Sequence, residues 1–178
     1  MAKAIPTTPL AATEVLPHLV SCPPTAISRM FSGLLDALAR HAETERDLQG
    51  IDIWDVACRH WLTDAENAFT DVATLLSAIQ RERPFRVEDL LLQRAARLID
   101  AMIGSEEPGM FQRLHYLLPR LDGQLYRPGN GPITEPVRQM LRTARGLIDE
   151  LASLQLYAET NGDEIGGPAP EPCAELAA

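Results

Sequence analysis

The sequence predicts an all-α protein: a single antiparallel bundle of four to five helices, with an extended N-terminal arm and a disordered acidic C-terminal tail. Two observations lead to this prediction. Apolar residues recur three and four positions apart in five successive segments, as on one face of a helix, and no segment alternates as a strand does. The chain of 178 residues, 46% of them hydrophobic, suits one domain with a substantial core. We assign residues 1–24 to the arm, 25–159 to the helical bundle and 160–178 to the tail.

The two ends of the chain lack helical periodicity. Pro6, Pro9 and Pro17 interrupt the arm, which also lacks the continuous apolar stretch of a secretory signal. The tail reads NGDEIGGPAPEPCAELAA from Asn161, and its content of Gly, Pro and acidic residues is typical of disorder.

The first helix is expected between Thr25 and Gln49. The Thr25 hydroxyl suits an N-cap, and Gly50 suits the left-handed residue that often ends a helix. One side of this helix is apolar and comprises Ile27, Met30, Phe31, Leu34, Leu35, Leu38 and Ala42.

The second helix is expected from Ile51 to just before Pro84. Its ~30 residues would span ~45 Å at the usual helical rise. Trp54, Cys58 and Trp61 belong to its apolar stripe, so both Trp rings should pack against a partner helix. Because this helix is longer than its neighbours, we expect its exposed end to provide a homodimer contact.

Two shorter helices are expected next. The third should run from Val87 to Ile103, with Val87 buried and Leu90 pointing outward as a lone exposed apolar residue. The fourth should begin at Ser105 and stop at Pro119, which has no backbone N–H to donate.

The fifth helix, expected from Thr134 as N-cap to Ala158, lies in an arginine-rich part of the chain. A helix N-terminus with arginines beside it attracts anions. We therefore predict that this region binds a phosphate- or carboxylate-bearing ligand, or an acidic protein partner. The candidate residues are Arg120, Arg127, Thr134, Arg138, Arg142 and Arg145. The alternative is that these arginines pair with the chain's own acids, such as Glu43, Asp47 or Glu106.

A second candidate site combines His41, Glu45 and Cys58. Glu45 falls near the centre of the first helix's apolar face, and burial of an unpaired carboxylate is costly. A short hairpin at Gly50 would bring Cys58 opposite the other two residues, giving a donor set that suits a transition metal. The alternative is that the apolar stripe ends there, so that Glu45 meets water or Arg59. A weaker candidate is the helix flank formed by His60, Asp64 and Asp71.

Composition and motifs argue against several functions. The net charge of −9 disfavours binding to nucleic acids or anionic membranes, which an acidic surface repels. The sequence has no nucleotide-binding glycine loop, no GxSxG, no HExxH and no Glu-x-x-His motif of dinuclear carboxylate bundles. Three widely separated cysteines fit a reducing cytoplasm, and the use of Arg in place of Lys fits a bacterial chain.

These observations predict a non-enzymatic cytoplasmic interaction module: an adaptor, accessory or assembly factor that acts through protein–protein contacts of its helical faces. The alternative function is a helical bundle that binds a metal or a small anion. The sequence offers no catalytic residues, and His115, at the margin of the fourth helix, is expected to be structural.

Overall fold

The fold is built from helices throughout the described residues. A computed structural model describes residues 23–51, 56–125 and 135–158, and for residues 121–125 the backbone alone. Within these ranges the chain forms a short 3-10 turn and five α-helices, and it contains no strand. The turn is Val56–Cys58, and the helices are α1 (Ala26–Asp47), α2 (Arg59–Arg81), α3 (Val87–Ile103), α4 (Met110–Leu125) and α5 (Glu135–Leu151). The predicted all-α class is confirmed.

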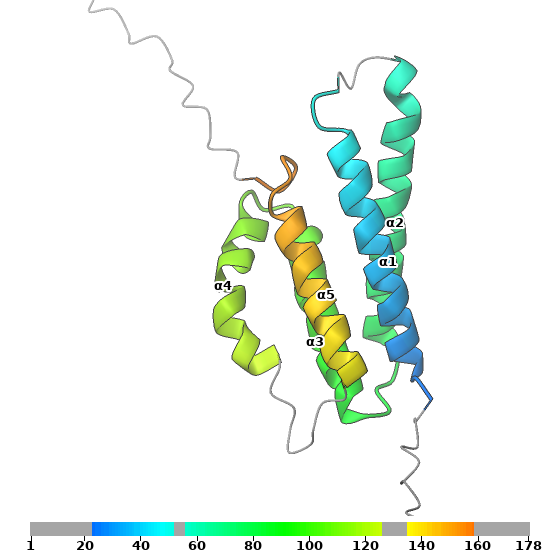
Figure 1. Cartoon of the computed structure of the whole chain (residues 1–178), viewed down its shortest axis with the longest axis vertical. Helices are drawn as coiled ribbons and strands as arrows, with labels where there is room; N and C mark the ends of the chain where they lie inside the picture. The colour runs from blue at the N-terminus through cyan, green and yellow to red at the C-terminus, as the bar shows by residue number, and fades with distance from the viewer. Residues whose placement is uncertain (1–22, 52–55, 126–134, 159–178) are drawn as a thin grey trace, which may run out of the picture.

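Consecutive helices run in opposite directions (Figure 1). α1 packs most extensively against α2 and also contacts α3 and α5. α4 lies at the side of the bundle, where α3 is its main neighbour. Short connections produce this antiparallel, up-and-down arrangement. None of the helices in the described ranges combines the length and apolar character needed to cross a membrane.

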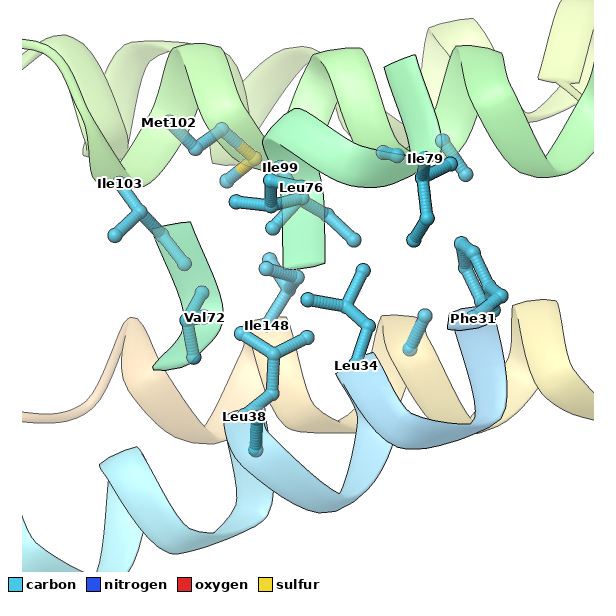
Figure 2. Close-up of a cluster of buried hydrophobic side chains, with 14 of the residues drawn as sticks. Phe31, Leu34, Leu38, Val72, Leu76, Ile79, Ile99, Met102, Ile103 and Ile148 are labelled. Atoms are coloured by element: carbon cyan, nitrogen blue, oxygen red, sulfur yellow. The ribbon is translucent and has the colours of Figure 1, made fainter. Parts of the chain in front are cut away.

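The core lies where the apolar stripes of α1, α2, α3 and α5 meet, and Phe111 and Leu118 of α4 extend it. Figure 2 shows side chains of α1, α2, α3 and α5 converging, with Leu34 and Leu38 of α1 and Leu76 of α2 near the middle. These three leucines are at most 2% exposed. Burial of one such side chain stabilises the fold by about 1.5–3 kcal/mol.

α1 begins as the sequence predicts. The Thr25 hydroxyl accepts a hydrogen bond from the Ser28 N–H at 3.1 Å, which satisfies one of the free donors of the first turn. At the other end, α1 stops at Asp47, and Gly50 adopts the predicted left-handed conformation with φ of 81°.

The predicted start of the second helix at Ile51 is wrong. Ile51 lies outside any helix, residues 52–55 are outside the described ranges, and α2 begins at Arg59 after the 3-10 turn. The apolar pattern continues through this turn, because a 3-10 turn and an α-helix place apolar residues at similar spacings.

Both predicted ends of the fourth helix are also wrong. The Ser105 hydroxyl accepts a hydrogen bond from the Glu107 N–H and forms a local turn, and α4 begins only at Met110, after Gly109 at φ of 71°. Pro119 lies inside α4, which continues to Leu125. At the N-terminal end, the Ser105 side chain stabilises a turn and not a helix start. At the C-terminal end, α4 tolerates the backbone N–H that Pro119 lacks.

The fifth helix ends earlier than predicted. α5 stops at Leu151, and the chain then forms irregular turns as far as Ala158. Because the chain leaves the helix here, it carries Leu154 into the core and Tyr157 across towards α1.

The predicted burial of Trp61 and Val87 is wrong. Trp61 is 40% exposed and Val87 is 55% exposed, whereas Trp54 lies outside the described residues. The α1–α2 hairpin projects beyond the ends of α3 and α5 (Figure 1), so that few elements cover the N-terminal end of α2. There the buried residues of α2 are the small Ala65 and Ala68, and the Trp61 ring lies at the edge of the buried surface.

Candidate functional site

His41 is the most deeply buried ionisable residue of the predicted sites. Its ring is fully enclosed, and its Nε2 atom lies 2.8 Å from the Tyr157 hydroxyl, at hydrogen-bonding distance. The Phe69 ring packs edge-on at 5.8 Å between ring centroids. Burial disfavours the imidazolium form and lowers the pKa of His41.

Glu45 lies one turn along α1 from His41, and its side chain is 15% exposed. Its Oε1 atom is 3.7 Å from His41 Nδ1, which is too far for a hydrogen bond, and Nδ1 has no hydrogen-bond partner among the described residues. Burial raises the pKa of the Glu45 carboxyl. Burial, and secondarily the Glu45 charge, raise the pKa of Tyr157. The arrangement is a buried polar contact between α1 and the segment that follows α5.

The structure does not bring His41, Glu45 and Cys58 together as a metal-binding group among the described residues. All three are described, yet the described residues contain no group of three or more His, Cys, Asp and Glu side chains that could hold a metal ion. Cys58 is buried and not in a disulfide, and it belongs to the 3-10 turn before α2. Tyr157 contacts the Nε2 atom of His41, and the Nδ1 atom faces Glu45.

The weaker flank of His60, Asp64 and Asp71 is likewise not among the described groups that could hold a metal ion. His60 Nδ1 lies 3.0 Å from the Ala57 carbonyl oxygen, and Asp71 forms an ion pair with Arg40 of α1 at 3.0 Å. These local contacts occupy two of the three side chains.

Tyr157 is the residue that the sequence analysis missed. It lies 116 positions from His41, in a segment predicted to be the end of a helix. Gln112 of α4 donates hydrogen bonds to the Tyr157 and Ala152 carbonyl oxygens, at 2.7 and 3.0 Å, and so holds the turn that presents the tyrosine. No sequence signal marks this partnership, because it depends on the path of the chain after α5.

The arginines of α5 have acidic neighbours within the chain. Arg138 and Arg142 both pair with Glu135, and Arg145 pairs with Asp149 at 3.0 Å. The sequence analysis gave pairing with the chain's own acids as the alternative to ligand binding, although it named Glu43, Asp47 and Glu106 as the partners. Arg120 is exposed on α4, whereas Arg127 and Thr134 lie outside the described residues, so binding of an anion at this helix start stays a prediction.

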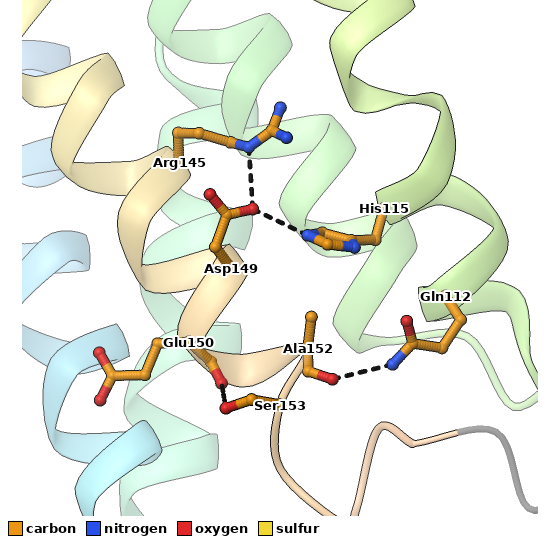
Figure 3. Close-up of polar contacts among 7 residues, drawn as sticks. All are labelled: Gln112, His115, Arg145, Asp149, Glu150, Ala152 and Ser153. Atoms are coloured by element: carbon orange, nitrogen blue, oxygen red, sulfur yellow. Dashed lines mark hydrogen bonds and ion pairs between the residues drawn. The ribbon is translucent and has the colours of Figure 1, made fainter.

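His115, which was expected to be structural, lies between α4 and α5. Its Nε2 lies 2.8 Å from the carboxylate of Asp149, which also accepts from Arg145 (Figure 3). In the same view, Gln112 reaches the Ala152 carbonyl oxygen. These contacts attach α4 to α5 and to the turn that follows it.

Apolar side chains gather on the outside of α3 and on the turn before it. Phe85 is 86% exposed, Val87 55% and Leu90 42%. Positions 87, 90, 94 and 97 share one stripe of the helix, so exposed Arg94 and Arg97 continue the stripe towards the C-terminus. We call these five residues the α3 surface: Phe85, Val87, Leu90, Arg94 and Arg97.

A buried carboxylate holds the turn that presents Phe85. Asp89 is 2% exposed, and its Oδ2 accepts from the backbone N–H groups of Phe85 and Arg86 at 2.8 and 2.9 Å. Its Oδ1 accepts from the Thr25 hydroxyl at 2.5 Å. Asp89 therefore joins the start of α1 to the α2–α3 turn, and Phe85 stands on a fixed backbone although its ring is exposed.

A hollow of about 820 Å³ lies between the start of α1 and this turn. Pro23 and Pro24 line one side, and Arg83, Phe85 and Arg86 line the other. Of the α3 surface, Phe85 borders this hollow.

A second, smaller group of exposed apolar side chains lies on α4. Tyr116 is 74% exposed and borders a hollow of about 690 Å³ together with Leu117 and Arg113. Arg113 pairs with Glu107 at 2.5 Å, so this group lacks the unpaired arginines of the α3 surface.

No protein-family model, no curated protein and no solved structure matches the chain.

Proposed function

We propose that the protein is a non-enzymatic interaction module that binds another protein through an exposed helical face. The observation that supports the proposal is the α3 surface, where Phe85, Val87 and Leu90 expose large apolar side chains beside one another in sequence. Contiguous exposed apolar surface rimmed by polar groups is typical of protein-binding sites. The expected adaptor, accessory or assembly role belongs to this proposal.

The rigidity of the surface supports the same function. Asp89 fixes the α2–α3 turn, and buried Gln93 donates to the Ile79 and Glu82 carbonyl oxygens at 2.9 and 2.7 Å, which closes the end of α2. A face that is already ordered loses little conformational entropy when it binds.

The test is co-purification from the cells that normally make the protein. We expect proteins that co-purify with the wild type to be lost with Leu90→Asp and retained with Thr143→Asp. Both positions are exposed helix sites, on α3 and α5. Equal recovery with both variants, at equal thermal stability, would contradict the proposal for this face.

A further inference from the structure

We propose that the α3 surface binds an acidic amphipathic helix of a partner protein. This inference rests on the proposed function and adds the chemistry of the partner. It starts from the two arginines of the stripe, which lie one turn and two turns beyond Leu90.

Arg94 and Arg97 are exposed and form no ion pair or side-chain hydrogen bond with any described residue. They differ in this respect from Arg138, Arg142 and Arg145 of α5, which have acidic partners in the chain. In a protein of net charge −9, these two arginines beside apolar side chains form a local positive field, because no described acidic residue pairs with them.

The order of side chains along α3 sets the chemistry of the occupant. Val87 and Leu90 are one turn apart, so they match apolar side chains at similar spacing on a helix laid along α3. Arg94 and Arg97 then require carboxylates further along that helix. Charge pairs of this kind accelerate association and fix the register, while burial of Phe85 and Leu90 supplies most of the affinity.

A second copy of the chain fits this face less well. A twofold contact places the same surface on both sides of the interface. With the axis near the arginines, Arg94 and Arg97 of one copy would meet those of the other, and with the axis near Leu90 they would meet apolar side chains. In neither case does the stripe supply a carboxylate to pair with them. Nucleic acids and anionic membranes are disfavoured by the overall negative charge.

The test is photo-cross-linking in native extract, with a benzophenone amino acid in place of Leu90. It is run with Arg94 and Arg97 intact, with Arg94→Glu plus Arg97→Glu, and with Arg94→Lys plus Arg97→Lys. We expect an adduct with another protein whose cross-linked peptide, mapped by mass spectrometry, is acidic and amphipathic. Its yield should fall at least tenfold in the Glu variant, persist in the Lys variant, and decrease as NaCl is raised from 50 to 500 mM.

Several results would overturn the inference. The first is an adduct with a second copy or with residues 159–178 of the same chain. The second is a cross-linked peptide without acidic residues. The third is a cross-linking yield that changes neither with the arginine substitutions nor with the NaCl concentration. If the Glu variant has a lower melting temperature than the wild type, its loss of cross-linking is not informative. The salt dependence of cross-linking with Arg94 and Arg97 intact then tests the inference.

The benzophenone is also placed at Tyr116 of α4, so that failure of the inference and failure of the proposed function can be told apart. An adduct from Tyr116 but none from Leu90 would support the proposed interaction module and contradict binding at the α3 surface. The absence of adducts from both positions contradicts both proposals.

Discussion

At the scale of single residues, the His41 contact shows how burial controls charge. Removal from water favours the neutral imidazole and the neutral carboxyl, so the pKa of His41 falls and that of Glu45 rises. The Tyr157 hydroxyl and His41 Nε2 share a hydrogen bond, and Nδ1 faces Glu45. A sequence can indicate that His41 and Glu45 share an inward face, as it did here. It cannot indicate Tyr157, whose position depends on tertiary structure.

The Tyr157 hydroxyl should stabilise the fold. Tyr157→Phe leaves His41 Nε2 enclosed without a partner, and we expect a loss of about 1–3 kcal/mol in the free energy of unfolding. Urea denaturation measures it. Tyr116→Phe, which removes an exposed hydroxyl, is the control and should change stability by less than about 0.5 kcal/mol. Equal effects of the two substitutions would contradict the assigned contact.

The Glu45 carboxyl should make stability depend on pH. Because its pKa is raised above the ordinary value of 4.5, its contribution is fully present below pH 4.5 and is lost as the pH rises through the folded-state pKa. Glu45→Gln should therefore raise the melting temperature at pH 7.5 and leave it unchanged at pH 4. Glu43→Gln, on the exposed side of α1, controls for the change in net charge. A lower melting temperature for Glu45→Gln at pH 7.5 would contradict this assignment.

At the scale of elements, local chemistry made some boundaries predictable and hid others. The Thr25 cap and Gly50 were correctly identified because each acts on its own backbone neighbours. The start of α4 was misplaced because Ser105 can cap a helix or form a turn, and the sequence pattern does not distinguish the two. Val87 was expected to be buried because it has helical spacing, but it is 55% exposed, and none of the described helices covers it.

Asp89 should be essential to the α2–α3 turn. Asp89→Ala removes the acceptor for two backbone N–H groups and the Thr25 hydroxyl, and we expect a loss of about 1.5–3 kcal/mol. Hydrogen exchange of the Phe85 and Arg86 amides should accelerate more than that of the α5 amides. Asp36→Asn, an exposed change on α1, is the control. Uniform acceleration across all helices would show that Asp89 acts globally and does not fix this turn.

At the scale of the whole molecule, the five helices share one core, and among the described residues one face of α3 stays exposed. The periodicity of the sequence was sufficient to predict the bundle, since each helix buries one stripe. It was not sufficient to locate the exposed apolar face, because Phe85 lies outside any helix and Val87 has the spacing of a core residue. The predicted homodimer stays a prediction.

The contrast between core and surface leucines should be large. Leu34→Ala, in the fully enclosed centre of α1, should cost about 2–5 kcal/mol, because it removes buried methyl groups and leaves a cavity. Leu90→Ala on the α3 surface should cost less than about 1 kcal/mol. Thermal unfolding followed by circular dichroism measures both. Similar losses would mean that Leu90 is packed inside the fold.

The uncovered α3 surface is the central claim, and arginine-selective labelling tests it most directly. Phenylglyoxal is applied to the purified chain and to the chain captured together with its co-purifying proteins, and the modified positions are read by mass spectrometry. We expect Arg94 and Arg97 to react in the isolated chain and to be protected at least fivefold in the captured one, while exposed Arg142 reacts equally in both. Equal labelling of Arg94 and Arg97 in the two samples would contradict the account.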